Sequence, residues 1–305
     1  MGTPLVSVIT PTFNRADLLP AAIESVRNQT CSDLEMIVVD DGSTDGTPQA
    51  VAAFHDPRIT YVGLGHTGKI SLLRNAGLRK ARGAFLAFLD SDDLWLPEKL
   101  QAQVNLLEAH PEAGFALCGF ESFNATGTIR RNLYRPEGQA GTSTSLASIF
   151  STLISGKMII YTSTALIRRS SLDVTGPFNE ELSSGDNEFF TRLAFHHTAA
   201  FVHLPLVRIR KHDGNTFRQR GPGDMAEAID SVEHFYALGA IPRVTYTERI
   251  LKYRYTLGTL LQERGELASA RREFLTCIRL RPTFLRGWRR YAATLLRSKT
   301  GRAPR

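Results

Sequence analysis

The sequence predicts an α/β protein with a doubly wound, mainly parallel sheet, followed by a small all-α region. Three observations lead to this prediction. Short apolar stretches alternate with stretches of helical periodicity along the first third of the chain. The apolar stretches end in loops rich in carboxylates, glycines and hydroxyls. Beyond Met225 the periodicity is helical and no clear strand is found. In a chain of 305 residues we therefore expect two regions, 1–222 and 223–305.

The first four strand candidates are apolar and rich in branched or aromatic side chains: 5–10, 36–39, 59–62 and 84–89. Helical spacing between them predicts helices that begin near Leu18, with Asp17 as its cap, near Thr47 and at Ile70. In such sheets ligands bind beyond the carboxyl ends of the strands. The loops that follow three of the strands, 11–15, 40–47 and 90–93, are therefore predicted to form one site of the kind that binds nucleotides.

The middle of the chain is less regular. It offers four further strand candidates and one helix: 115–118, 158–161, 165–168, 201–210 and the helix 189–196. The polar stretch 127–144 is interpreted as a mobile loop over the site.

The run Asp90-Ser91-Asp92-Asp93 follows the buried strand 84–89 directly. Three carboxylates in four residues repel one another and lose free energy when they are desolvated. A bound divalent cation would relieve that repulsion, and carboxylate oxygens suit Mg²⁺ or Mn²⁺. The alternative is an acidic turn that caps a helix over 97–110, with Asp93 near the N-cap and Pro97 near the first turn.

Composition excludes several classes of protein. The apolar runs are far too short to span a membrane, and the first residues do not resemble a signal peptide. Three widely spaced cysteines, Cys31, Cys118 and Cys277, show no metal-binding spacing and indicate free thiols in a reducing compartment.

Charge is distributed unevenly along the chain. Residues 1–240 hold 21 Lys and Arg against 26 Asp and Glu, whereas residues 241–305 hold 16 against 4. A basic helical region can meet anionic lipid, nucleic acid or an acidic partner, or it can be a solvated surface. The spacing of one tetratricopeptide repeat, over about 251–284, is seen in Leu257-Gly258, Leu261, Gly265, Ala270, Phe274 and Pro282.

At this point the sequence resembles a known family. The ordered motifs resemble glycosyltransferase family 2, the inverting enzymes of GT-A fold, over roughly 5–215. The motifs are 6–14, Glu24-Ser25-Val26 with Gln29-Thr30, 38–47, Gly68 with Arg74-Asn75, and 89–93, which contains a DxD pattern. The resemblance implies a three-layer α/β/α domain with a mainly parallel mixed sheet.

The resemblance also implies roles for individual residues. Pro11, Thr12 and Asp41 would line the nucleotide pocket, where Asp41 accepts a hydrogen bond from the base. Asp40 would either join that pocket or orient its loop. Lys69 and Arg74 would lie near the base or the phosphates, although Arg74 could instead be a residue on the helix surface or an internal partner of Asp90. The nucleotide-sugar site is thus expected to hold Pro11, Thr12, Asp40, Asp41, Lys69, Arg74, Asp90 and Ser91, with Asp90 near the ribose.

Inverting transfer needs a general base beside the acceptor hydroxyl. Counting back from Arg192-Leu193 places Asp186 at the position of the family's base. Gly185 stands where the family usually has Glu, and Glu188 is a second choice of base. The alternative is that Asp186 only caps the helix that follows. Asp92, helped by His212, would hold the Mn²⁺ or Mg²⁺ ion that bridges the diphosphate.

The resemblance predicts a metal-dependent hexosyltransferase. It would use a nucleotide-diphospho-sugar, with UDP or dTDP favoured, and a glycan, lipid-linked or protein acceptor, in cell-surface polysaccharide synthesis. Two alternatives stay open: an inert GT-A domain that serves as a helical-repeat adaptor, and a sugar nucleotidyltransferase. We expect a cytoplasmic protein, peripheral at the inner face of the membrane through its basic region. Self-association is left open, and no nucleic acid is expected as a partner.

Overall fold

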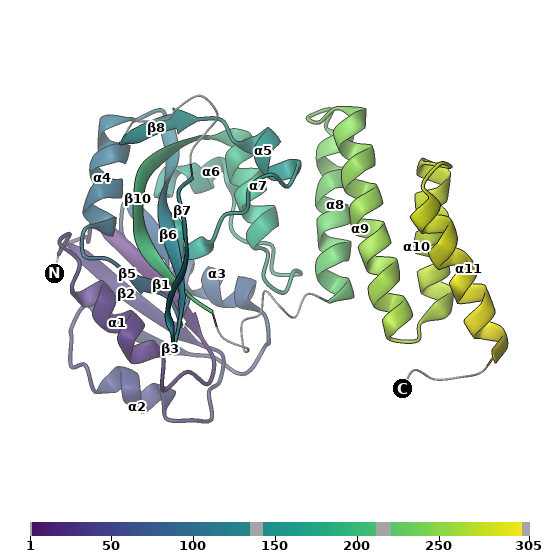
Figure 1. Cartoon of the computed structure of the whole chain (residues 1–305). Coiled ribbons are helices and arrows are strands. Elements are labelled where there is room, and N and C mark those ends of the chain that lie inside the picture. The colour runs from purple at the N-terminus through teal and green to yellow at the C-terminus, as the bar shows by residue number, and fades with distance from the viewer. Residues whose placement is uncertain (1, 135–142, 212–220, 301–305) are drawn as a thin grey trace. The chain divides into compact units, whose positions relative to one another are not determined.

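The structure is a computed structural model that describes residues 2–134, 143–211 and 221–300 (Figure 1). The chain divides into two compact units, Met1–Asp213 and Gly214–Arg305. The first unit contains a mixed, mostly parallel sheet with flanking helices, and the second contains helices.

The described strands of the first unit belong to one sheet. They are β1 (Val6–Thr12), β2 (Leu34–Asp40), β3 (Ile59–Gly63), β4 (Phe85–Phe88), β5 (Leu94–Trp95), β6 (Ala113–Asn124), β7 (Gly127–Asn132), β8 (Thr144–Ala147), β9 (Ala165–Arg168) and β10 (Thr198–Arg210). Their order along the sheet is β3-β2-β1-β4-β9-β6-β10-β5, with β7 beside β6 and β8 beside β10.

The helices of this unit are α1 (Leu19–Arg27), α2 (Thr47–Ala52), α3 (Ile70–Lys80), α4 (Lys99–Ala109), α5 (Phe150–Ile154), α6 (Leu172–Thr175) and α7 (Asp186–His196). Figure 1 shows α1 and α4 on one face of the sheet and α3 and α7 on the other. Right-handed crossovers explain why α1 and α3 lie on opposite faces, because the chain moves one way from β1 to β3 and then returns past β1 to β4.

The predicted α/β class and the mainly parallel sheet are confirmed. β1 pairs in parallel with both β2 and β4, while β9 is antiparallel to β4 and β6. The order of the strands reverses between β1 and β4, which is where such sheets open a crevice for ligands. β1, β2 and β4 are buried along their whole length, so their apolar side chains form the core on both faces.

α3 packs unusually close to this part of the sheet because it carries Gly77. A Cβ atom at position 77 would lie 2.4 Å from Cγ2 of Ile9 in β1. The close approach brings the N-terminal half of α3 to the strand ends.

Some local predictions were wrong, for identifiable physical reasons. The segment 158–161 is apolar but forms no strand, because the Tyr134 hydroxyl donates to Ile159 O and accepts from Tyr161 N. The expected loop 127–144 contains the exposed strand β7, which pairs with the end of β6, and part of it lies outside the described residues. Asp17 does not cap α1, which begins at Leu19 with no side-chain cap.

The second unit contains α8 (Pro222–Ala237), α9 (Arg243–Glu263), α10 (Leu267–Leu280) and α11 (Leu285–Thr300). Consecutive helices pack on one another, and Phe274 of α10 fills the space beside Gly258 of α9, 2.8 Å from where a Cβ atom would lie. Arg254 ties three of the helices together through ion pairs with Glu233 of α8 and Glu273 of α10. The likeness of 251–284 to a tetratricopeptide repeat stays a prediction.

Within the described part of the chain, no helix combines the length and the apolar character that crossing a membrane requires.

Candidate active site

The carboxyl ends of β1 and β2 lie side by side and position the first group of predicted residues. Thr12 pairs in register with Asp40, and the next amide, Asp41 N, donates to Thr12 O at 3.0 Å. Pro11 and Thr12 are buried at the end of β1, and the Thr12 hydroxyl has no hydrogen-bond partner among the described residues. A buried hydroxyl without a partner at a strand end is suited to meet a ligand.

Asp40 is fully buried and holds the loop that follows β2. Its carboxylate accepts from the amide and hydroxyl of Ser43, at 3.1 and 2.5 Å, and from the hydroxyl of Tyr61, at 2.5 Å. Burial, and then the Asp40 carboxylate, raise the pKa of Tyr61 to about 12. The turn needs Gly42, whose φ is +77° and whose missing Cβ leaves room for the amide of His66. Asp40 therefore orients the loop.

Asp41 faces the loop that precedes α3. Its Oδ1 accepts from the amide and hydroxyl of Thr67, at 2.8 and 2.7 Å, and its Oδ2 accepts from Gly68 N at 2.8 Å and lies 3.0 Å from His66 Nδ1. The His66 ring stacks on the half-exposed ring of Phe13, with centroids 4.3 Å apart. Residues 66–68 thus fill the acceptor positions of the Asp41 carboxylate, which is the group predicted to accept a hydrogen bond from a nucleotide base.

The acidic run after β4 divides into two kinds of carboxylate. Asp93 turns inward, where it accepts from Ser163 Oγ at 2.7 Å and from Arg210 N at 3.1 Å. Burial, and then the neighbouring Asp90 and Asp92, raise its pKa well above the usual value. Asp93 does not cap α4, whose N-cap is Glu98, so the capping interpretation of this run was wrong. Asp90 and Asp92 are half-buried, and Ser91 is buried between them.

Arg74 joins the acidic run to α7. Its guanidinium is 1% exposed, pairs with Asp90 at 3.2 Å and with Asp186, and lies over the ring of Phe178. The surrounding protein desolvates the Asp90 carboxylate, and Asp186 and Asp92 repel it. Together these effects outweigh Arg74 and raise the pKa of Asp90 to about 6, although 40% of its side chain stays accessible. Three of the predicted site residues therefore converge on one point.

Asp186 is the first residue of α7, and 30% of its side chain is exposed. The preceding Gly185 has a φ of +69°, a left-handed conformation that favours glycine. This conformation accounts for glycine at position 185, where the family that the sequence resembles usually has Glu. Glu188, the second choice of base, is held by Arg192 of the same helix at 2.6 Å.

Asn75, beside Arg74, fixes the chain that leads to Asp186. Its side-chain amide donates to Phe178 O at 2.8 Å and accepts from Phe178 N at 3.0 Å. Lys69 precedes α3, and its ammonium donates to Glu180 O at 3.0 Å. The Arg-Asn pair and Lys69 thus connect α3 to the segment 178–186.

Sequence reasoning did not single out Ser163, Tyr61, Thr67 or Arg210. Ser163 lies 73 positions from Asp90, whose amide donates to its hydroxyl at 3.1 Å. No local pattern marks such a residue, because only the sheet brings β9 beside β4. Thr67 lies in the glycine-rich loop 63–68, which could have pointed to it.

The predicted metal ligands are only partly placed. Asp92 is described, but His212 lies outside the described residues. Within the described ranges no group of three or more His, Cys, Asp or Glu side chains is arranged to hold a metal ion.

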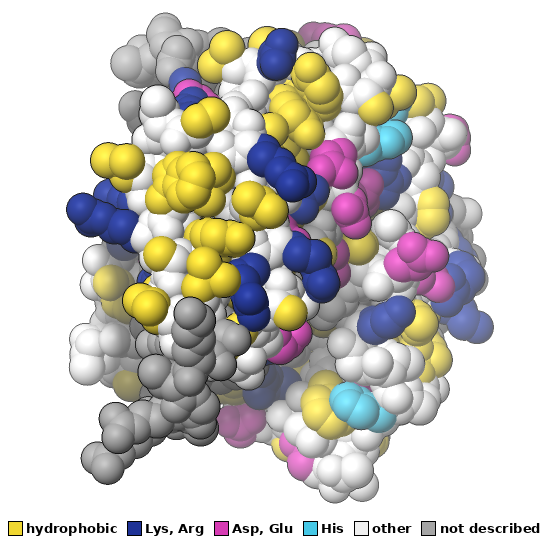
Figure 2. All heavy atoms as spheres, turned by 90° about the vertical axis from the view of Figure 1, so that its right-hand side faces the viewer, with side chains coloured by type: hydrophobic (Ala, Val, Ile, Leu, Met, Phe, Trp, Pro, Cys, Tyr) yellow, Lys and Arg dark blue, Asp and Glu magenta, His cyan; other side chains and the backbone are white. Residues whose placement is uncertain are grey.

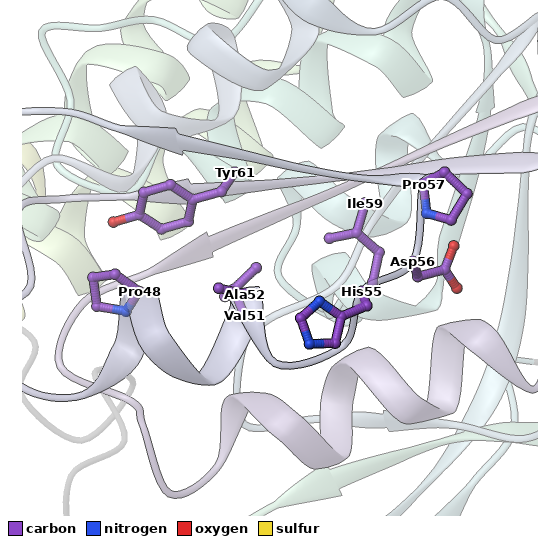
Figure 3. Close-up of a pocket in the computed structure, with 8 residues that line it drawn as sticks. All are labelled: Pro48, Val51, Ala52, His55, Asp56, Pro57, Ile59 and Tyr61. Carbon is purple, nitrogen blue, oxygen red and sulfur yellow. The ribbon is translucent and has the colours of Figure 1, made fainter.

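A pocket of about 370 Å³ lies elsewhere, between α2 and β3 (Figure 3). Its lining is mostly apolar, and its acidic residue Asp56 is already paired with Arg27 and Arg58. Because both arginines pair with Asp56, its carboxylate charge is already neutralised and is not available to a cation. The acidic strand ends, and not this pocket, form the candidate active site.

Comparisons with known proteins agree with the resemblance. The model of the family named Glycosyl transferase family 2 matches residues 7–175. TuaG of Bacillus subtilis (strain 168), provisionally named a teichuronic acid biosynthesis glycosyltransferase, is 37% identical over 137 residues, 44% of this chain and 54% of TuaG. WfgD of Escherichia coli, a UDP-Glc:α-D-GlcNAc-diphosphoundecaprenol β-1,3-glucosyltransferase, is 40% identical over 107 residues, 35% of this chain and 42% of WfgD. The chain thus spans about half the length of these relatives.

Solved structures share the fold. The structure of Staphylococcus aureus TarS 1-349 in complex with UDP-GlcNAc matches 98% of this chain and 93% of its own, with a TM-score of 0.64 and 19% identity. The mannosyltransferase PcManGT of Pyrobaculum calidifontis, in complex with GDP-Man and Mn²⁺, matches 98% of this chain and 81% of its own, with a TM-score of 0.58 and 21% identity.

Proposed function

This chain belongs to glycosyltransferase family 2 and has the GT-A fold, and from that premise we propose that it is an inverting, metal-dependent transferase. It moves a sugar from a UDP- or dTDP-sugar to a hydroxyl of a lipid-linked glycan in cell-surface polysaccharide synthesis. The observation that carries the proposal is the convergence of Asp90 and Asp186 on Arg74, beside the carboxyl ends of β1 and β2.

The nucleotide end of the donor belongs at β1 and β2. The unpartnered Thr12 hydroxyl, Pro11 and the half-exposed Phe13 ring offer a polar contact and a stacking surface for a base. Asp41 accepts the N–H of the base once residues 66–68 release its carboxylate. A uracil or thymine N–H matches a carboxylate acceptor, which favours UDP or dTDP.

The reaction takes place between Asp90 and Asp186. Asp186 accepts the proton of the acceptor hydroxyl while that oxygen attacks the anomeric carbon from the side opposite the diphosphate. The bond to the diphosphate breaks, and the configuration at the anomeric carbon inverts. Arg74 holds the Asp186 carboxylate in place, and Asp90 meets the ribose side of the donor.

The side chains at this site are suited to a divalent cation. Asp90 and Asp92 present oxygen ligands, and Asp93 turns away toward Ser163. Mg²⁺ and similar ions usually use one or two carboxylates together with substrate phosphates, so a complete protein cage is not needed. When bound, the cation would neutralise charge on the departing nucleoside diphosphate. Asp92 would hold it, with His212 as a further ligand, while Asp90 stays at the ribose.

The acceptor is proposed from the relatives. WfgD is named for transfer to a sugar on diphosphoundecaprenol, which is a lipid carrier. A carrier of this class places the reaction at a membrane surface, and we propose the cytoplasmic face.

The test is release of nucleoside diphosphate by the whole chain with Mn²⁺, from UDP- and dTDP-sugars, with and without a polyprenyl-diphosphate-linked sugar. We expect release from one donor to depend on the acceptor, with the glycosidic bond inverted relative to the donor. No transfer from any nucleotide-sugar, or retention of configuration, would contradict the proposal.

A further inference from the structure

The last helix, α11, presents an exposed apolar face. Leu285, Trp288, Leu295 and Leu296 are 69%, 48%, 40% and 68% exposed. With the exposed Ala292 they recur at intervals of three and four residues, which places them on one side of a helix. Large apolar side chains gathered in this way on a surface mark an interaction site.

This face is not the one that packs against the rest of the helical unit. Gly287 faces inward, where a Cβ atom would lie 2.9 Å from Phe284 Cδ1 and 3.4 Å from Ile278 Cγ1. Thr294 is fully buried on the same side. α11 therefore packs on α10 through the side that carries Gly287 and Thr294, and its apolar face stays exposed.

Basic residues flank the apolar face. Arg286 and Arg289 are exposed on α11, and after Glu273 the sequence holds nine Lys and Arg and no Asp or Glu. Figure 2 shows hydrophobic side chains gathered beside Lys and Arg side chains on the side where α11 lies. A helix that is strongly amphipathic, basic along one flank and apolar with Trp and Leu on its outer side is typical of helices that lie in a membrane interface.

We propose that the outer face of α11 docks on an anionic lipid surface. Trp288 and the leucines enter the boundary between headgroups and acyl chains, while Arg286 and Arg289 meet the lipid phosphates. Charge favours lipid over a second copy of the chain, because two copies joined through this face would bring their arginine flanks together. The inference goes beyond the proposed function, since lipid docking needs neither donor nor acceptor.

Tryptophan fluorescence of the full chain tests this directly. The chain has two tryptophans, of which Trp95 is buried and Trp288 is exposed. Vesicles of phosphatidylcholine with phosphatidylglycerol should shift the tryptophan emission of the parent to the blue, and the protein should co-sediment with them. The variant Trp288→Phe should still co-sediment but lose most of the blue shift. Pure phosphatidylcholine vesicles, and high salt, should weaken sedimentation.

Two variants separate the apolar and the basic contributions. Trp288→Asp/Leu296→Asp should lower the vesicle-bound fraction by about tenfold or more, because it places charge on the apolar face that would enter the lipid. Arg286→Gln/Arg289→Gln should lower binding to the anionic vesicles only. The matched control, Lys80→Gln/Lys157→Gln, removes two exposed charges of the first unit and should bind as the parent does.

The inference would be overturned if the Trp288→Asp/Leu296→Asp variant bound vesicles as the parent does. It would also be overturned if the parent bound no vesicle and instead formed dimers that this variant abolished. Because vesicle binding is measured without a nucleotide-sugar, its failure is distinguishable from failure of the proposed transfer.

Discussion

Arg74 and Asp186 form an ion pair across 112 positions of sequence, and the same guanidinium bonds Asp90 at 3.2 Å. Arg74 is buried, so its charge is balanced by the two carboxylates and by the face of Phe178. One side chain thus sets the relative position of the residue proposed to meet the ribose and the residue proposed to act as base.

Replacement of this guanidinium should therefore damage catalysis even when the charge is kept. Lys lacks the planar fork that bonds two carboxylates at once. We expect Arg74→Lys to lower kcat by about tenfold or more, with a smaller change in the KM of the donor. Steady-state kinetics beside a melting curve checks this, and a variant that is as active as the parent would show that the bridge has no catalytic role.

Asp186 and Glu188 give a matched pair of variants on one helix. Loss of a general base commonly lowers the rate by about 10²- to 10⁴-fold, and we expect a loss in this range for Asp186→Asn with nucleotide binding preserved. Glu188→Gln should retain most of the activity, because Glu188 pairs with Arg192 within α7, whereas Asp186 shares the Arg74 guanidinium with Asp90 at the acidic run. If Glu188→Gln were the inactive variant, the roles of the two residues would be exchanged.

Thr67 donates two hydrogen bonds to Asp41, whose carboxylate is proposed to accept the N–H of the base. Its amide and hydroxyl both donate to Asp41 Oδ1, so binding of a base N–H there requires residues 66–68 to move. Thr67→Val removes the hydroxyl bond and should tighten nucleotide binding several-fold, since less free energy is needed for release. Calorimetric titration measures the change. Weaker or unchanged binding would mean that Asp41 only supports this loop.

Lys99 provides a pH test of the core. Its ammonium is fully buried, 3.9 Å from the Trp95 ring centroid, and donates to Ala165 O at 3.1 Å. Burial lowers the pKa of Lys99 to about 7. The unfolded chain therefore binds more protons than the folded chain between that value and the usual pKa near 10.5, so this residue makes stability rise with pH across that window.

Replacement by Met should remove this effect. Lys99→Met should be more stable than the parent below about pH 7, by an amount on the order of a few kcal/mol, and the advantage should shrink toward about pH 10. Denaturant unfolding at several pH values measures the difference. A difference that does not vary with pH would show that Lys99 has an ordinary pKa in the fold.

The sequence predicted the regular parts of the fold because local pattern and tertiary structure agree there. The buried parallel strands at Val6, Leu34 and Phe85 are nearly continuous apolar runs. Where the prediction failed, side chains distant in sequence decided the structure. The Tyr134 hydroxyl hydrogen-bonds the carbonyl of Ile159 and the amide of Tyr161. The exposed strand β7 forms because it pairs with β6.

The candidate site was predictable in part for the same reason. Motif positions identified Asp41, Arg74, Asp90 and Asp186: three of them lie at a strand end or a helix terminus, and Arg74 lies within α3. The residues that hydrogen-bond to these side chains could not be predicted from the neighbouring sequence. Ser163 and Arg210 reach the acidic run only through the sheet, and the arrangement of 66–68 around Asp41 depends on tertiary contacts.

The central claim is a metal-dependent nucleotide-sugar site at the ends of β1, β2 and β4. The most direct measurement is a thermal-shift titration with UDP, dTDP and GDP, each with Mn²⁺ and with EDTA, on the parent and on Asp92→Ala. We predict that UDP or dTDP raises the Tm only with Mn²⁺, and that Asp92→Ala loses this rise while it still unfolds cooperatively. No rise with any nucleotide, or an equal rise in EDTA and in Asp92→Ala, would contradict the claim.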